Sequence, residues 1–193
     1  MRKLKLQVQI SVDGYVGGPK GEMDWLVRNW DAELIQYVTA LTESFDCIVL
    51  GRKLAEGFIP HWAGIAADAN HPEHAAGQKF TNTPKVVFTK SLAQVVWPQT
   101  ILATGDLVAE IQALKQQPGG DIIAYGGATF VSALIKHGLI DEFHLFVNPT
   151  ALGRGLAIFK ELNGKQNLKL VQATPFSCGI VVLNYSLSNE EAR

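Results

Sequence analysis

Three short stretches of the sequence carry the residue types that bind phosphate groups: glycine, cations and hydroxyl side chains. In the first stretch, Gly51-Arg52-Lys53, two cations follow a glycine at the end of an apolar run. Glycine lets a ligand approach the backbone closely, and an arginine side chain can hold a phosphate through two parallel hydrogen bonds. The pattern predicts a phosphate site here, although a solvated turn accounts for the same residues.

The second stretch, Thr89-Lys90-Ser91, also follows an apolar run and supplies hydroxyl and ammonium donors. In an open α/β sheet, ligands bind beyond the carboxyl ends of the strands. Two strand ends that both present donors and cations favour one shared anion site, whereas a plain loop is the alternative.

In the third stretch an apolar run leads through Gly126-Gly127 into Ala128-Thr129 and a helical pattern. The N-terminus of a helix offers unpaired N–H groups and the positive end of the helix dipole, which suits a pyrophosphate. The glycine pair equally allows close packing of a strand against a helix. Because the spacing differs from Gly-x-Gly-x-x-Gly, an ordinary dinucleotide-binding fingerprint is not indicated.

Other catalytic and metal-binding patterns are weak in this sequence. His71 and His74 share a spacing that fits one helix face, but no cysteine or acidic partners accompany them. We therefore expect two surface histidines and predict no metal site.

The elements that must position the three stretches follow from residue periodicity. Alternating apolar and polar residues over 4–10 predict a strand with one buried face. Short apolar runs bounded by turn residues predict the further strands 47–50, 85–89, 100–103, 121–125, 142–148, 168–174 and 180–187.

Helical periodicity predicts three helices between these strands. Asp31 and Asp106 are expected N-caps of the first two, and the third runs from Gly127 to near Gly138. The expected buried stripe of the first helix is Leu34, Ile35, Val38, Leu41 and Phe45. Residues 52–83 are irregular, and we expect short helical turns and surface loop there.

Strands that alternate with helices and then pair near the end predict an α/β fold. Its sheet is mostly parallel with antiparallel C-terminal strands, and residues 1–193 form a single domain. The acidic segment 189–191 is expected to fray.

Composition narrows the classes of partner. The chain has 193 residues and a formal net charge of -1, whereas proteins that bind nucleic acid usually carry a basic surplus. No apolar run approaches the roughly 20 residues needed to cross a bilayer, and the N-terminus does not read as a signal peptide. We expect a cytoplasmic protein with a small-molecule substrate, without a nucleic-acid or membrane partner.

In this order, the motifs resemble the dihydrofolate-reductase-like family. The closer resemblance is to the C-terminal reductase domain of the bacterial bifunctional riboflavin-biosynthesis deaminase-reductase and its stand-alone relatives. It covers nearly the whole chain. The motifs that carry it are Ser11-Val12-Asp13-Gly14-Tyr15, Gly51-Arg52-Lys53, Thr89-Lys90-Ser91, Tyr125-Gly126-Gly127, Gly138-Leu139-Ile140-Asp141-Glu142 and residues 149–155.

The resemblance implies a three-layer fold with NADPH lying across the strand ends. By analogy, Arg52 and Lys53, with Lys90 and Ser91, hold the adenosine 2′-phosphate, and Gly51 and Thr89 also belong to the cofactor-binding residues. Gly126, Gly127, Ala128 and Thr129 cradle the pyrophosphate, with a cis peptide bond between the glycines. Val12, Asp13 and Gly14 border the nicotinamide. Relatives commonly carry threonine two residues after the arginine, where this chain has Leu54.

The reaction that the resemblance implies is hydride transfer from NADPH to a C=N bond of a pteridine- or aminopyrimidine-type metabolite. Asp31 and Glu33 are the candidates for binding substrate nitrogens or supplying the proton, and helix capping is their alternative role. Asp24, Trp25, Phe58 and Trp62 are candidates for shaping the substrate pocket, although large aromatics often simply pack.

Two other functions stay open: a dihydrofolate reductase proper, and a non-catalytic NADPH-binding sensor. By analogy with relatives, a homodimer is also expected, with the strand Phe143–Val147 and the closing strands at its interface.

Overall fold

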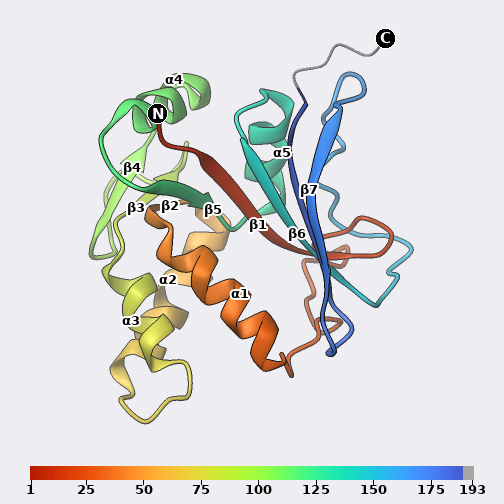
Figure 1. Cartoon of the computed structure of the whole chain (residues 1–193). Coiled ribbons are helices and arrows are strands. Elements are labelled where there is room, and N and C mark those ends of the chain that lie inside the picture. Colours follow the sequence, from red (N-terminus) through yellow and green to blue (C-terminus); the bar gives the residue numbers. More distant parts are fainter. Residues whose placement is uncertain (189–193) are drawn as a thin grey trace.

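A computed structural model describes residues 1–188, in which eight strands form a single sheet (Figure 1). The acidic segment 189–191, expected to fray, lies outside the described residues. The strands are β1 Leu4–Ser11, β2 Phe45–Gly51, β3 Lys85–Phe88, β4 Thr100–Ala103, β5 Asp121–Ala124, β6 Glu142–Asn148, β7 Leu168–Pro175 and β8 Val181–Leu187. The helices are α1 Ala32–Glu43, α2 Arg52–Ala67, α3 His74–Asn82, α4 Leu107–Gln116 and α5 Ala128–Lys136.

The strand order across the sheet is β4-β3-β2-β5-β1-β6-β8-β7. The first six strands in this order run parallel, while β8 pairs antiparallel with both β6 and β7. The predicted mostly parallel α/β sheet with antiparallel C-terminal strands is therefore confirmed. Its carboxyl edge collects the ends of six strands.

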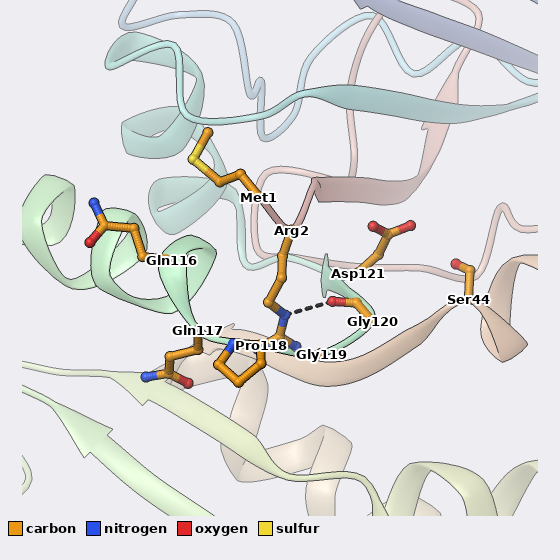
Figure 2. Close-up of a pocket in the computed structure, with 9 residues that line it drawn as sticks. All are labelled: Met1, Arg2, Ser44, Gln116, Gln117, Pro118, Gly119, Gly120 and Asp121. Carbon is orange, nitrogen blue, oxygen red and sulfur yellow. Dashed lines mark hydrogen bonds between the residues drawn. The ribbon is translucent and has the colours of Figure 1, made fainter.

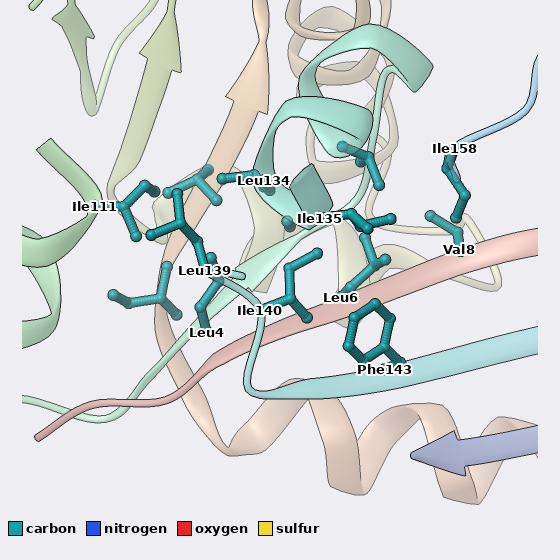
Figure 3. Packing of buried hydrophobic residues seen from close by; sticks show 14 of the residues in the cluster. Leu4, Leu6, Val8, Ile111, Leu134, Ile135, Leu139, Ile140, Phe143 and Ile158 are labelled. Atoms are coloured by element: carbon teal, nitrogen blue, oxygen red, sulfur yellow. The ribbon is translucent and has the colours of Figure 1, made fainter. Parts of the chain in front are cut away.

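One face of the sheet is covered by α4 and α5. The apolar residues of β1, Leu4, Leu6 and Val8, pack in one buried cluster with Ile111 of α4 and Leu134 of α5 (Figure 3). Burying each such side chain contributes roughly 1.5–3 kcal/mol to stability. This face therefore fixes α5, whose first turn follows the glycine pair.

The opposite face is covered by α1, α2 and α3. Ile48 and Leu50 of β2 pack there with Leu41, Ile59 and Phe80, one from each helix. A smaller cluster joins Leu34 of α1 to Phe146 of β6 and to the β7–β8 hairpin. Helices on both faces of the sheet complete the predicted three-layer architecture.

The prediction of short turns and loop for residues 52–83 was wrong, because α2 and α3 occupy most of this segment. Pro60 lies inside α2, and the neighbouring small residues weaken the helical pattern in the sequence. The two helices are held by aromatic packing. Trp62 of α2 lies 4.3 Å from Phe80 of α3, measured between ring centroids.

Two details of α1 also differ from the prediction. Phe45 belongs to β2 rather than to the helix, and Ile35 is 52% exposed rather than buried. Leu34 and Leu41 form the buried part of the expected stripe. Phe45 falls outside the helix because α1 ends at Glu43, two residues before it.

The strand Phe143–Val147 cannot supply a dimer interface, so that part of the dimer prediction was wrong. It lies within β6, between β1 and β8, and Phe143 and Phe146 are fully buried in their own chain. The closing strand β7 is at the edge of the sheet, and most of its residues are exposed.

Within residues 1–188, no helix is both long enough and apolar enough to cross a membrane.

Candidate functional site

The four stretches assigned to cofactor binding follow four consecutive strands of the sheet. The strands are β3, β2, β5 and β1, and all four run in the same direction (Figure 1). Gly51 pairs with Phe88, and Ala124 pairs with both Val49 and Leu6. The strand order therefore brings the stretches after Phe88, Leu50, Tyr125 and Ser11 to one edge.

The ends of β2 and β5 are in direct contact. The backbone N–H of Gly51 donates to the carbonyl of Gly126 over 3.3 Å. A Cβ atom at Gly51 would come within 2.8 Å of the Cβ atom of Phe130, in the first turn of α5. Glycine is required here for close packing, and the first predicted phosphate stretch lies directly beside the third.

The glycine pair forms the bend between β5 and α5. Gly126 has a φ of +137°, a conformation that favours glycine, and the Gly126–Gly127 peptide bond is cis, as the resemblance implies. Gly127 is the N-cap of α5 and makes no side-chain cap bond. A Cβ at Gly127 would meet no atom within 4 Å. The start of α5 is therefore open to a ligand.

Helix α2 begins in a similar way, with Gly51 as an N-cap that makes no side-chain cap bond. Arg52 forms an ion pair with Glu56 one turn along the helix (Nη1–Oε1, 2.5 Å), and its side chain is 33% exposed. Lys53 is exposed. A surface ion pair of this kind contributes about 0–1 kcal/mol, so Arg52 is readily redirected to an anion.

The side chains of Thr89 and Lys90, after β3, already make hydrogen bonds within the protein, which the sequence did not indicate. The hydroxyl of Thr89 is buried and accepts hydrogen bonds from the backbone N–H groups of Ser91 and Leu92. Lys90 Nζ donates to the carbonyls of Thr104 and Gly105, over 2.7 Å each. Thr89 thus shapes the turn, as the plain-loop alternative requires, and Lys90 is held between the ends of β3 and β4.

Asp13 joins two loops at the other end of this edge. Its carboxylate accepts from the hydroxyl of Ser11 (2.6 Å) and from the backbone N–H groups of Leu152 (3.1 Å) and Gly153 (2.6 Å). These hydrogen bonds, that from Ser11 first, lower the pKa of Asp13 to about 2. Asp13 therefore positions the loop of Val12, whose side chain is 60% exposed.

Leu54 lies against the glycine pair. A Cβ placed on Gly126 would come within 3.3 Å of Leu54 Cδ2. The leucine methyl groups therefore occupy the space beside the bend where a threonine hydroxyl would offer a donor.

The structure places Asp31 and Glu33 at the start of α1. Asp31 is the N-cap and accepts from Leu34 N (2.8 Å), and also from Cys178 N and Ser177 Oγ in the β7–β8 turn (2.9 Å each). The backbone N–H groups of Leu34 and Cys178 lower the pKa of Asp31 to about 2. Such a group is ionised at neutral pH, so Asp31 is a hydrogen-bond acceptor and is unsuited to donating a proton. Glu33 is exposed in the first turn.

The four residues assigned to the substrate pocket fall into two separate groups. Phe58 and Trp62 belong to the aromatic packing between α2 and α3, where Phe58 also stacks on Tyr125 at 5.4 Å. Asp24 is exposed, and Trp25 donates from Nε1 to the carbonyl of Glu22. The packing alternative thus accounts for Phe58 and Trp62, while Trp25 lies in the loop that precedes α1.

A hollow of about 530 Å³ lies at the opposite, amino edge of the sheet (Figure 2). Arg2 crosses it, donating from Nε to the carbonyl of Gly120 (2.6 Å) and pairing with Asp46. Its cation is already neutralised, and none of the predicted site residues lines it.

Two residues that sequence reasoning missed lie beside the predicted site. Asn148, the last residue of β6, is fully buried, and its side-chain amide donates to the side chain of Gln9 on β1 over 2.7 Å. A polar residue at the end of the apolar run 143–147 was the available signal for Asn148. Gln9 gave no separate signal, because it continued the alternating pattern of the first strand.

Comparison with known proteins gives a consistent family. Residues 2–182 match the family described as RibD C-terminal domain. The uncharacterized protein YyaP of Bacillus subtilis is 30% identical over 186 residues, which cover 95% of this chain and 94% of YyaP.

Solved structures share the fold. A putative riboflavin biosynthesis protein from Shewanella sp. PV-4 superposes with a TM-score of 0.71 at 22% identity, covering 98% of this chain and all of the other. A dihydrofolate reductase from Enterococcus faecalis, complexed with NADP(H), gives a TM-score of 0.62 at 17% identity, covering 97% of each chain.

Proposed function

Since the chain belongs to the RibD C-terminal domain family, we propose that it is an NADPH-dependent reductase of an aminopyrimidine- or pteridine-type metabolite. The reaction is hydride transfer to a C=N bond, resembling the reduction of a ribosylamino-pyrimidine in riboflavin biosynthesis. The chain would act in the cytoplasm on a small molecule.

One observation carries this proposal. The loops after β3, β2, β5 and β1 lie side by side at one edge. The first two contain residues assigned to the 2′-phosphate of one dinucleotide, the third contains those assigned to its pyrophosphate, and the fourth those assigned to its nicotinamide. An extended ligand such as NADPH can therefore contact all four in turn. This arrangement supports a single cofactor site over four unrelated loops.

The residues present fit the phosphate groups of the cofactor. Two helices begin at neighbouring glycines without a side-chain cap, so their first-turn N–H groups suit a pyrophosphate. Arg52, Lys53 and Lys90 provide cations beside them for a 2′-phosphate, with Ser91 as a further donor. The open space at Gly127 gives room for the ligand.

Near the nicotinamide, the chain positions the ring and the substrate and supplies the proton. NADPH, when bound, supplies the hydride. The hydrogen bonds from the backbone N–H groups of Leu152 and Gly153 to Asp13 hold Val12 and Gly14 at the end of β1, where they border the nicotinamide ring. Asp31, ionised and held by three donors, is suited to accepting a hydrogen bond from a substrate nitrogen, which leaves Glu33 as the acid for proton delivery.

The test is NADPH binding followed by NADPH oxidation against a panel of aminopyrimidines and pterins. We expect tighter binding of NADPH than of NADH, and absorbance loss with an aminopyrimidine. Cofactor binding without consumption by any compound would instead favour the sensor. Tight methotrexate binding with turnover of dihydrofolate would favour a dihydrofolate reductase proper, and absence of NADPH binding contradicts all three.

A further inference from the structure

Asn148 has a side-chain orientation that the backbone around it dictates. Its Oδ1 accepts from the N–H of Val27 over 2.9 Å, and its Nδ2 donates to the carbonyl of Phe146 over 3.0 Å. A backbone N–H can only donate and a carbonyl can only accept. Because Asn148 is fully buried, no water competes for these positions. Its amide therefore has one possible orientation.

That orientation determines how Gln9 is presented. The Nδ2 group of Asn148 also donates to Gln9 Oε1 over 2.7 Å. Since Gln9 must turn its oxygen towards this donor, its own NH₂ group faces away from Asn148. Among residues 1–188, no hydrogen bond uses Gln9 Nε2. Two N–H donors on a half-buried side chain are thus left for another molecule.

The position of Gln9 is at the edge that carries the candidate site. It lies two residues before Ser11, the last residue of β1, in register with Phe146 of β6. On the other side, β5 pairs with β1 only as far as Leu6 and Ala124, so at Gln9 no β5 residue completes the ladder. The chain leaves β5 there through the bend at Gly126. Gln9 therefore lies beyond the last β1–β5 pair, where β5 gives way to the glycine bend.

Gln9 also lies on the α1 side of the sheet. The residues of β1 that pack against α4 and α5 are Leu4, Leu6, Val8 and Ile10, so Gln9 points to the opposite face. Its neighbour Phe146 contacts Leu34, near the start of α1, and Trp30. The start of α1 carries Asp31 and Glu33, which were assigned to the substrate.

We propose that Gln9 is a specificity-determining residue that donates its amide hydrogens to a carbonyl oxygen of the substrate. The proposal rests on the proposed function, because it takes the substrate to lie at the end of β1. Its chemical content is a preference for an oxo group over an amino group at the ring position that faces Gln9.

The test compares two pyrimidines that differ in this respect: 6-aminouracil, and triaminopyrimidine, in which amino groups replace both ring carbonyls. Binding is measured by calorimetry on the full chain with NADP⁺ present. We expect the wild type to bind 6-aminouracil about tenfold more tightly, the effect of one hydrogen bond and the unpaired donors left without it. Gln9→Glu replaces the donors with a carboxylate and should reverse the preference, and Gln9→Met should bring the ratio close to one.

Gln172→Glu provides the matched control, because it makes the same change at an exposed residue of the edge strand β7. It should leave the affinity ratio as in the wild type. The inference is overturned if Gln9→Glu leaves the ratio unchanged, or if the wild type binds neither compound. Titration with NADPH alone tests the proposed function separately, and if it fails, the ratio measured without cofactor still decides the role of Gln9.

Discussion

Two pairs of helices begin at the carboxyl edge of this sheet, and the two pairs differ in how their N-termini are capped. In α1 and α4 an aspartate is the N-cap, with Asp31 accepting from Leu34 N and Asp106 from Ala109 N. In α2 and α5 the N-cap is Gly51 or Gly127, and neither helix has a side-chain cap bond. Helix α3 also lacks such a bond, but it follows a surface turn at Glu73 rather than the end of a strand.

The difference teaches which helix ends are available to an anion. An aspartate cap satisfies a first-turn N–H and puts a negative charge at the positive end of the helix dipole. A glycine cap has no side chain to accept a hydrogen bond from the first-turn N–H groups and places no negative charge at the helix dipole. This lowers the stability of the helix slightly. The two glycine-capped ends are the adjacent ones, joined by the bond from Gly51 to Gly126. This is the pattern expected where a ligand supplies the charge.

The largest effect is expected when the glycine cap of α5 is replaced by an aspartate, the residue that caps α1. Gly127→Asp should reduce NADPH affinity by about 100-fold or more, because a carboxylate would repel the pyrophosphate at close range. The free energy of unfolding should stay the same or rise by a few tenths of a kcal/mol, since Asp is the better cap. Titration and thermal denaturation measure the two effects.

Gly127→Asn is the matched control for that change. It has the same shape and capping ability without the charge, so the affinity loss should be much smaller. Equal losses for both variants would contradict a charged ligand at α5.

Removing the cation at the other glycine-capped helix should have the next largest effect. Arg52→Met should weaken NADPH binding by about 10- to 100-fold, the loss of charge-assisted hydrogen bonds to the 2′-phosphate, and leave NADH binding nearly unchanged. Parallel titrations with both cofactors check this. Glu56→Gln, which frees Arg52 from its ion pair, should not weaken NADPH binding, and an equal loss for NADPH and NADH in Arg52→Met would remove the 2′-phosphate assignment.

The aspartate-capped pair should show its effect on stability. Asp31→Ala should lower the melting temperature more than Asp106→Ala, because Asp31 holds three donors and Asp106 holds Ala109 N. The folded-state pKa of Asp31 is about 2, below the ordinary 3.8. The unfolded chain therefore binds more protons between pH 2 and 4, so this contribution is complete above that range and disappears as the pH falls through it.

Denaturation of the wild type and Asp31→Ala at several pH values checks both the size and the sign. The difference between them should be constant near neutrality and shrink below pH 4. A difference that grows on acidification would contradict the assigned role.

The smallest effect is expected at Leu54, beside the glycine bend. Leu54→Thr should tighten NADPH binding by a few fold, because a hydroxyl donor replaces methyl groups at the edge of the phosphate site. Leu54→Val makes a similar loss of volume without the hydroxyl and should not tighten binding. If both variants behave alike, the departure from threonine has no bearing on the cofactor.

Local features of the sequence predicted much of the fold. β6 has the expected bounds, the caps Asp31 and Asp106 are at the expected residues, and α5 ends before Gly138, whose φ is +61°. These features depend on neighbouring residues alone: a carboxylate bonds an N–H three residues away, and glycine adopts a positive φ. The helices within residues 52–83 were not predicted, because Pro60 and small residues interrupt the helical periodicity of the sequence there. Tertiary packing around Phe80 stabilises them instead.

What lay beyond sequence reasoning is which strands are neighbours and what covers them. The alternation in β1 indicated a polar face towards solvent, yet Gln7 is buried and its side-chain oxygen has no partner among residues 1–188, because α1 lies over that face. Likewise, the sequence around Asp13 does not predict its hydrogen bond with Gly153, and the sequence around Asn148 does not predict its hydrogen bond with Gln9.

The sequence by itself thus determined the residue types and the turn positions, namely the glycines, the cations and the aspartate caps. The tertiary structure alone decided that β3, β2, β5 and β1 adjoin in that order and that Asn148 turns the amide of Gln9. Both depend on contacts between residues far apart in the chain, from 37 positions between Ile48 of β2 and Lys85 of β3 to 139 positions between Gln9 and Asn148. Such contacts follow from the joint packing of helices on the two faces of the sheet, which no local pattern encodes.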